Sequence, residues 1–420
     1  MASLELEHAI GFSGRLPDAL FAVPGTRKAV YVAGGCIVLR EFATESTGQT
    51  FLRGHQNQIS ALSMSQRGKF LASGEYGINS DVVIWDLENT KFLFRLSEHD
   101  YGIDHLDFSD DERFLVSVGN FRDKKMIIWE VATGYIVTTG AFLPTPLTSI
   151  AFGGRVLDEK GQGTEKYQLC TIGGSVILYW TFNPKTGDLT NEPFNCGSLT
   201  RDFSCVRFSI EGDQVFAGTT TGDVLVFNVK NRIMTANVPV CRAGVRSLVV
   251  RAADLTPDTT RRTRKYYRSY ADVDHKGEFI RTFLVGGGDG SVSRWFGHQT
   301  HWECQAECQT PGAVLSLSPD GPEGALYVGT SEGTILRVDT GFKPHVLAEN
   351  HTGPITALTF MDGSSDLFCS ASTDGTIRVW DSADFELAVK IRAPANVTPL
   401  CIALADICLL VGFSDGAVRC

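Results

Sequence analysis

Short apolar stretches that alternate with polar positions recur along the whole chain, and they predict β-strands rather than helices. The clearest example is a series of three runs, Ile355–Phe360, Leu367–Ser372 and Thr376–Asp381, each with period-2 alternation. The Thr-Asp-Gly sequence at 373–375 separates the last two runs, and an Asp-Gly turn between alternating segments favours an antiparallel hairpin. The pattern therefore predicts a small antiparallel sheet.

The same layout repeats from the N-terminal to the C-terminal part of the sequence. One residue closes the third predicted strand of each unit, and these residues are, in order, Arg40, Trp85, Trp129, Trp180, Phe227, Trp295, Val338 and Trp380. Most of their spacings lie in the forties, and several units begin after a histidine and end in Trp-Asp or Trp-Glu. This period and these residues are typical of the blades of WD-repeat propellers.

The repeats predict an all-β fold: a WD-repeat β-propeller with one complete seven-bladed ring followed by the start of a second propeller. We expect residues 1–345 to form the first ring, with residues 5–12 supplying the outer strand of its last blade. Residues 346–420 are expected to form the first blades of a second, incomplete propeller. Two alternatives stay open for that part: the natural chain continues further, or these blades join and enlarge the first ring.

Polar residues recur at fixed places in the predicted blades. A loop histidine, a second-strand serine, a turn aspartate and the tryptophan can form a buried hydrogen-bonded chain that satisfies each polar group. We predict two such structural sets: His55, Ser73, Asp81 and Trp85 in one blade, and His351, Ser372, Asp374 and Trp380 in another. Because blade geometry explains all of these residues, we expect none of them to be catalytic.

A long insertion at 252–278 contains the strongest local concentration of charge. Its cations and tyrosines are Arg261, Arg262, Arg264, Lys265, Tyr266, Tyr267 and Arg268. One interpretation is a solvated basic loop. The other is a partner-binding arm that docks on an acidic protein surface, with arginine contacting carboxylates and tyrosine adding contact area.

The overall charge limits the classes of partner. Lys and Arg number 38 against 48 Asp and Glu, which gives a net charge of −10, so we expect neither nucleic acid nor an anionic membrane as a partner. No apolar run approaches the roughly 18 residues that a membrane-spanning helix needs. The 11 cysteines lack the spacing of a disulfide framework, which favours reduced thiols in the cytoplasm.

Some motifs imitate catalytic or metal sites. Residues 329–333 and 412–416 match Gly-x-Ser-x-Gly, but a predicted strand follows each motif where a nucleophile elbow requires a helix. Four candidate zinc ligands lie close in sequence: His298, His301, Cys304 and Cys308. On a strand the two cysteines would be about 13 Å apart, too far to bind one zinc ion. We therefore predict no enzyme, no metal site and no cofactor.

Certain stretches go beyond the generic repeat. They lie at 4–6, 10–14, 51–57, 72–74 with 81–86, 218–223 and 327–330. The Ile-Gly-Phe sequence at 10–12 and the Gly-Thr-Thr-Thr-Gly-Asp run at 218–223 carry most of the weight, because they are not generic WD-repeat residues. With these stretches the chain resembles the family of cilia- and flagella-associated protein 52, tandem-propeller proteins of axonemal doublet microtubules.

That resemblance implies a non-enzymatic microtubule inner protein of the cilium or flagellum, within the axonemal cytoskeleton. The partners that it implies are α/β-tubulin, bound on its luminal face in the B-tubule, and other microtubule inner proteins near the inner junction. It also implies a second propeller. The insertion at 252–278 is longer than the family leads us to expect, which leaves its role open. The alternative function is that of a general WD-repeat adaptor scaffold in a soluble protein complex.

Overall fold

The computed structural model describes most of the chain as strands joined by turns and loops. The described residues are 6–42, 48–140, 146–158, 162–252, 281–298, 300–320, 324–360, 366–405 and 408–420. Within them, no helix is long and apolar enough to span a membrane. All the structural statements below concern these residues.

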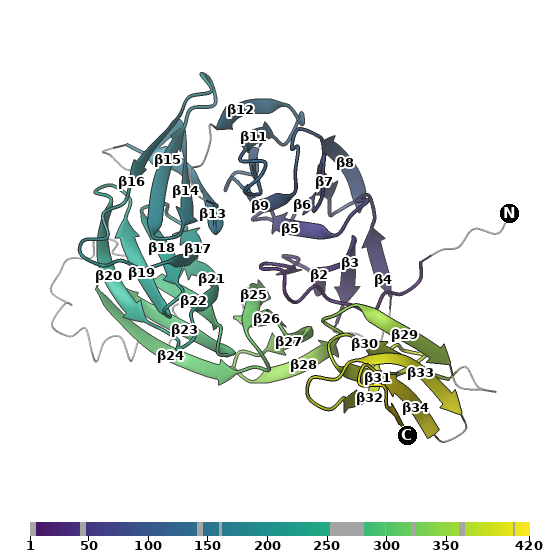
Figure 1. The fold of residues 1–420 in the computed structure, drawn as a ribbon. Coiled ribbons are helices and arrows are strands. Elements are labelled where there is room, and N and C mark those ends of the chain that lie inside the picture. Colours follow the sequence, from purple (N-terminus) through teal and green to yellow (C-terminus); the bar gives the residue numbers. More distant parts are fainter. Residues whose placement is uncertain are drawn as a thin grey trace.

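Seven four-stranded antiparallel sheets of the described residues are arranged in a ring (Figure 1). The first four sheets comprise β1 (Leu20–Ala22), β2 (Lys28–Ala33), β3 (Cys36–Glu41) and β4 (Gln49–Leu52); β5 (Ile59–Met64), β6 (Phe70–Glu75), β7 (Val82–Asp86) and β8 (Lys91–Leu96); β9 (Ile103–Phe108), β10 (Phe114–Gly119), β11 (Met126–Glu130) and β12 (Ile136–Gly140); and β13 (Ser149–Leu157), β14 (Gly163–Gly173), β15 (Val176–Phe182) and β16 (Leu189–Pro193).

The next three sheets complete the ring. They comprise β17 (Phe203–Phe208), β18 (Gln214–Thr219), β19 (Asp223–Asn228) and β20 (Ile233–Pro239); β21 (Val245–Ala252), β22 (Arg281–Gly287), β23 (Ser291–His298) and β24 (His301–Gln309); and β25 (Val314–Asp320), β26 (Ala325–Thr330), β27 (Thr334–Val338) and β28 (Pro344–Glu349). Each residue that was expected to close a third strand lies in the third strand of its sheet.

The ring closes because the first sheet lies against the seventh. The backbone N–H of Asp18 donates to the carbonyl of Leu315 at 3.0 Å. Within β1 and just before it, the N–H groups of Ala22 and Ala19 donate to the hydroxyls of Ser318 and Ser316, at 2.8 and 2.9 Å. The first strands of all seven sheets line a shared axial cavity of about 910 Å³.

The outer strand of the seventh sheet differs from the expectation. The prediction that residues 5–12 form this strand is wrong, because β28 pairs with β27 there, in the register Val338↔Pro344 to Thr334↔Glu349. A proline can open a strand, where no ladder N–H is required of it. The seventh sheet therefore extends to Glu349 and past the expected boundary at 345.

The N-terminal residues pack against the ring without forming a strand from residue 6 to residue 19. Phe12 is buried, with its ring edge-on to Tyr31 at a centroid distance of 6.2 Å. A Cβ at Gly329 would lie 2.6 Å from Cζ of Phe12, so only glycine fits at that point of β26. This segment thus fills the junction between the first and seventh sheets.

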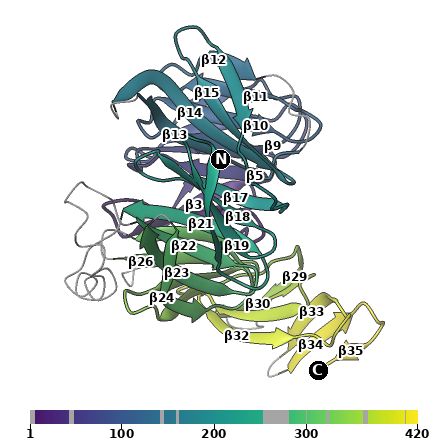
Figure 2. The ribbon, with the colours of Figure 1, turned by 90° about the vertical axis from the view of Figure 1, so that its left-hand side faces the viewer.

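Two further sheets follow the ring. The eighth comprises β29 (Ile355–Phe360), β30 (Leu367–Ser372), β31 (Thr376–Asp381) and β32 (Leu387–Arg392), and the ninth β33 (Pro399–Ala405), β34 (Cys408–Phe413) and β35 (Val418–Arg419). Figure 1 shows the eighth sheet next to β28, and Figure 2 shows that both sheets project from the ring. Their bounds at β29, β30 and β31 are those that the sequence predicts.

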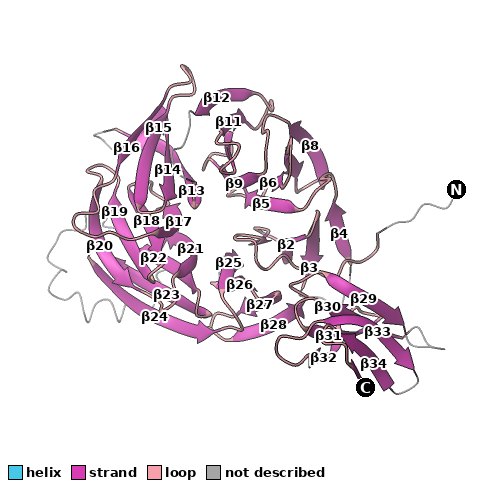
Figure 3. Cartoon of the chain, in the orientation of Figure 1, coloured by secondary structure: helices cyan, strands magenta, loops and turns pink. Residues whose placement is uncertain are grey.

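The core lies between neighbouring sheets rather than at a single centre. One cluster, for example, joins Ile84 of the second sheet to Leu106 and Trp129 of the third. At Gly74 a Cβ would approach Cγ2 of Ile103 to 2.7 Å, which shows how closely these two sheets pack. Because no sheet buries both faces alone, stacking around the ring supplies the core. Figure 3 shows the described residues as strands and connecting loops.

Candidate functional site

A buried polar set in the third sheet gives the clearest geometry. His99 Nε2 lies 2.7 Å from the hydroxyl of Ser117, and Trp129 Nε1 donates to the same hydroxyl at 2.8 Å. His99 Nδ1 lies 2.6 Å from a carboxylate oxygen of Asp123, and both side chains are fully buried. Burial is the largest single influence and opposes the charge on Asp123, but the contacts with His99 and the two backbone N–H groups that it accepts together outweigh burial and lower the pKa of this carboxyl. This set is not one of the two that the sequence predicts.

The set in the second sheet differs from the prediction in its acidic member. His55 Nε2 lies 2.6 Å from the Ser73 hydroxyl, to which Trp85 Nε1 donates at 2.9 Å. The expected acid, Asp81, instead pairs with Arg95 at 2.6 Å. Glu75 takes its place, with an oxygen 3.6 Å from His55 Nδ1.

In this second set, burial favours the neutral form of the histidine. It lowers the pKa of His55, although the carboxylate of Glu75 acts in the opposite direction. The prediction failed at Asp81 because this residue stands immediately before β7, where it faces the guanidinium of Arg95. Glu75 is the last residue of β6. Its carboxylate reaches the loop that contains His55 and accepts the N–H of Gln56 there.

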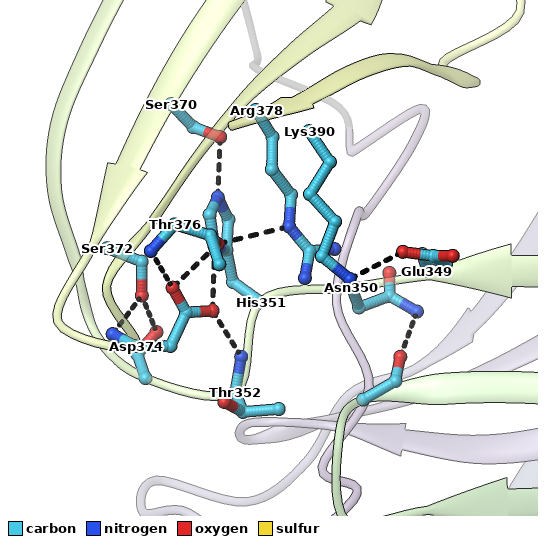
Figure 4. Close-up of polar contacts among 12 residues, drawn as sticks. Glu349, Asn350, His351, Thr352, Ser370, Ser372, Asp374, Thr376, Arg378 and Lys390 are labelled. Atoms are coloured by element: carbon cyan, nitrogen blue, oxygen red, sulfur yellow. Dashed lines mark hydrogen bonds and ion pairs between the residues drawn. The ribbon is translucent and has the colours of Figure 1, made fainter. Parts of the chain in front are cut away.

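The set in the eighth sheet differs in its serine (Figure 4). His351 Nδ1 lies 2.9 Å from Asp374, as expected of this pair, but His351 Nε2 lies 2.8 Å from Ser370 and not from Ser372. Trp380 Nε1 also donates to Ser370, at 2.8 Å. The predicted serine, Ser372, donates instead to the carbonyl of Gly353 at 3.0 Å.

A positional signal could have identified the correct serine. Ser73, Ser117 and Ser370 each occupy the fourth position of the second strand in their sheets, whereas Ser372 occupies the sixth. Since residues two apart on a strand face the same side, alternation alone does not distinguish Ser370 from Ser372. The position counted from the start of the strand does distinguish these two serines.

The acids of these sets fix the loops that enter each sheet. Asp123 accepts the N–H groups of Asp100 and Tyr101, at 2.7 and 3.2 Å. Glu75 accepts two further N–H groups, both at 2.9 Å. Both acids are buried and accept N–H groups of these loops, so they are suited to hold loops in place and not to contact a substrate.

The axial cavity contains charges of both signs. Arg207 of β17 pairs with Asp18, which precedes β1, at 2.6 Å, and this pair links the fifth sheet to the first. Burial alone would disfavour the cation, but Asp18 and Asp107 outweigh it and raise the pKa of Arg207. Asp107 accepts the N–H of Phe152 at 2.7 Å, and burial raises its pKa to about 6. These contacts connect sheets across and around the cavity.

The basic partner-binding residues predicted at 261–268 lie outside the described residues. The preceding and following strands are described: β21 ends at Ala252 and β22 begins at Arg281. Arg281 contacts Asp213 at 2.6 Å and Glu211 at 3.2 Å, both from the fifth sheet. These ion pairs anchor the start of β22 to the neighbouring sheet.

The candidate zinc ligands are distributed along a hairpin. His301, Cys304 and Cys308 belong to β24, while the side chain of His298 lies outside the described residues. His301 and Cys304 are exposed, and Cys304 Sγ contacts the carbonyl of Ala306 at 3.6 Å. In the part of the chain that the structure describes, no three His, Cys, Asp or Glu residues are placed to hold a metal ion.

Several contacts join the eighth sheet to the ring. The ring of His8 stacks on Phe385, in the turn before β32, at a centroid distance of 4.2 Å, and His8 Nε2 lies 2.9 Å from Gln49 Nε2 of β4. Lys390 of β32 pairs with Glu349 of β28 at 2.7 Å. The N-terminal segment and β28 thus both contact the eighth sheet.

Comparison with known proteins agrees with this geometry. The family model described as "WD domain, G-beta repeat" matches residues 46–86, 90–130 and 343–381. The chain carries WD40 repeats. Among solved structures, the "Crystal structure of RRP9 WD40 repeats" superposes with a TM-score of 0.55 at 16% identity, over 77% of this chain and 88% of that chain. At this identity the likeness supports the fold and carries no information on function.

Curated relatives match over nearly the whole chain. The chain is 29% identical to "Cilia- and flagella-associated protein 52" of Chlamydomonas reinhardtii, over 99% of this chain and 63% of the relative. It is 27% identical to the Homo sapiens protein of the same name, over 95% of this chain and 59% of the relative. The chain therefore spans less than two thirds of the length of these relatives.

Proposed function

We propose that the chain is a structural microtubule inner protein of ciliary and flagellar doublet microtubules. In this proposal it binds tubulin and neighbouring inner-junction proteins in the lumen of the B-tubule and stabilises the doublet. The observation that carries the proposal is the similarity to proteins named Cilia- and flagella-associated protein 52 across 95–99% of this chain. Those names support a place in the cilium or flagellum; the partners are the finer part of the proposal.

The architecture suits a binding scaffold. The conspicuous polar sets are buried and hold loops, and in the axial cavity Arg207 pairs with Asp18. Ring-stacked sheets present many loops on a rigid frame, and such loops are where binding residues concentrate. We therefore propose a non-enzymatic role that depends on protein–protein contacts.

We also propose that residues after 349 open a second propeller. The first strand of the eighth sheet exposes Ile355, Leu358 and Phe360 by 54–58%, although the matching strand in the second sheet buries its apolar residues. A blade cannot bury both faces alone, so these side chains favour further sheets packed against them. This proposal retains the expected two-part organisation, with the boundary moved past Glu349.

Axoneme fractionation tests the proposed function. The full chain would be expressed with an epitope tag in ciliated cells, and demembranated axonemes would be washed with rising salt. Salt screens exposed charge pairs, so proteins held on the outer surface by such contacts dissociate. We expect the tagged chain to stay with the salt-washed doublets, while a tagged outer-surface protein, as the control, is released.

The opposite result would favour the adaptor alternative. If the chain leaves with the membrane-and-matrix fraction or in the first salt wash, it acts in a soluble complex and the luminal proposal fails. Chemical crosslinking of the retained doublets, followed by mass spectrometry, should then place this chain in contact with tubulin. Retention without any tubulin crosslink would contradict the tubulin-binding part.

A further inference from the structure

Exposed apolar side chains gather at one end of the second and third sheets. Tyr76 and Ile78 lie in the loop between β6 and β7, and Phe121 lies in the loop between β10 and β11. Their exposed fractions are 61, 75 and 59%. Arg122 is next to Phe121 and its guanidinium lies 5.6 Å from the centre of that ring. We call these four residues the 76–122 patch.

The two loops of the patch are in contact with each other through a third loop. The backbone of Ile78 forms an antiparallel bridge with Tyr101, and the N–H of Asn120 donates to the carbonyl of Gly102 at 2.7 Å. A Cβ at Gly102 would lie 3.5 Å from Cα of Tyr76 and 3.2 Å from Nδ2 of Asn120. The loops that carry the patch are therefore held next to one another across two sheets.

Buried hydrogen bonds hold these loops in position. Asp123, hydrogen-bonded to buried His99, accepts the backbone N–H of Tyr101, and Asn120 Oδ1 accepts the N–H of Arg122 at 3.0 Å. On the other loop, Glu75 accepts the N–H of Asp81 at 3.4 Å. A surface that is fixed before binding loses little conformational freedom on association, which favours affinity.

The charges around the patch indicate the chemistry of its partner. Two acidic side chains on these loops are paired within the chain: Asp81 with Arg95 at 2.6 Å and Asp100 with Lys125 at 2.8 Å. Arg122 is exposed, and its only side-chain contact described is with the ring of Phe121. Aromatic residues and arginine are the types enriched in the energetic centre of protein interfaces.

We propose that the 76–122 patch docks a protein segment that presents aliphatic side chains flanked by carboxylates. The aliphatic groups pack on Tyr76, Ile78 and Phe121, and a carboxylate pairs with Arg122. This inference goes beyond the proposed function, because it names a surface and a partner chemistry and holds whether or not tubulin supplies the segment. The patch lies at the end of the strands opposite to the one where β21 leads into the basic insertion.

A peptide titration on the full chain tests the docking surface. The probe is a short fluorescent peptide of leucine and glutamate, compared with one that has lysine for glutamate and one that has serine for leucine. We expect the Leu/Glu peptide alone to bind. The Tyr76→Ser, Phe121→Ser double variant should weaken its binding by at least about tenfold, since each exposed anchor is lost. Arg122→Glu should weaken it by a similar factor through repulsion.

A matched control lies at the other end of the third sheet. Tyr135 is 75% exposed in the turn between β11 and β12, so Tyr135→Ser removes an equally accessible aromatic group without touching the patch. This variant should bind the peptide like the unmodified chain, and thermal unfolding should show all variants folded. If the double variant unfolds, Arg122→Glu carries the test.

Three outcomes would overturn the inference: no binding of the Leu/Glu peptide, equal binding by the patch variants, or equal binding of the lysine peptide. None of them bears on axoneme retention, which tests the proposed function separately. Conversely, release of the chain from salt-washed axonemes would leave the peptide result standing as evidence for a different partner.

Discussion

At the scale of single residues, one buried serine hydroxyl serves both the histidine and the tryptophan of a WD40 sheet. The sequence predicts the residue types of this arrangement, since His, Ser and Trp recur at similar places. It did not distinguish Ser370 from Ser372, because both lie on the same face of β30. Nor did it identify Glu75, because the choice between Glu75 and Asp81 depends on the position of Arg95 in space.

Ser117 offers a direct test of the polar sets. Ser117→Ala removes the partner of His99 Nε2 and of Trp129 Nε1 and leaves both nitrogens buried. Each unsatisfied buried group costs about 1–3 kcal/mol, so the free energy of unfolding should fall by at least about 1 kcal/mol. Urea unfolding measures it. Thr133→Ala, in an exposed turn, should stay within about 0.5 kcal/mol of the unmodified chain, and an equal effect of both substitutions would contradict the assignment.

Asp107 predicts a pH dependence of stability. Burial raises its pKa to about 6, against about 3.9 for an aspartate in an unfolded chain. The folded state therefore binds the proton more tightly, so this group stabilises the fold below pH 4 and loses that contribution as the pH rises to about 6. Asp107→Asn should gain stability relative to the unmodified chain across this interval.

The measurement is urea unfolding at a series of pH values. Asparagine retains a carbonyl oxygen that can accept the N–H of Phe152, so the variant keeps that contact. Asp188→Asn, at an exposed position, is the control and should show no such divergence. Parallel pH curves for Asp107→Asn and the unmodified chain would show that Asp107 does not titrate in this way.

At the scale of elements, alternation and turn residues predict most strand positions. β29, β30 and β31 have the expected bounds. β28 was missed because it begins at a proline near the start of the next repeat, and the sequence shows no change in hydrophobic pattern there. Its place became evident only from pairing with β27, a contact that local sequence does not encode.

The basic insertion at 252–278 supplies a prediction at this scale. Its composition offers charge and little apolar area, so it should contribute to docking and not to folding. We expect replacement by serine of Arg261, Arg262, Arg264, Lys265 and Arg268 to reduce retention on salt-washed axonemes. The thermal midpoint should stay nearly unchanged.

The matched control for this variant removes the same number of cations elsewhere. It replaces by serine the exposed residues Arg67, Lys69, Lys91, Lys166 and Lys185. Because the net charge changes equally in both variants, a specific role requires that only the insertion variant loses retention. Unchanged retention, or a large drop in the thermal midpoint, would refute the docking role of the insertion.

At the scale of the whole molecule, the count of repeats predicts a ring followed by additional sheets, and the structure adds how they are joined. The closing contacts between β1 and β25, the link from Arg207 to Asp18 and the stacking of His8 on Phe385 connect residues far apart in sequence. No periodicity predicts such pairs. The proposed function rests on the similarity to proteins named Cilia- and flagella-associated protein 52 and not on any residue cluster.

Limited proteolysis tests the division after Glu349. The seven sheets of the ring pack on both sides, whereas the eighth and ninth sheets expose apolar residues such as Leu358 and Leu400. Segments with fewer buried contacts open more often and are cut first. We expect early loss of residues after 349 and a resistant fragment that ends near β28, apart from cuts within 253–280. Equal resistance of the C-terminal sheets would indicate one larger cooperative unit.

The most direct test of the central claim is a density map of native doublet microtubules from ciliated cells in which the chain has a bulky N-terminal label. The account predicts propeller-shaped density in the lumen of the B-tubule near the inner junction, with the label beside it and tubulin in contact with its loops. Label density on the outer surface of the doublet, or none on doublets that retain their other inner proteins, would contradict it.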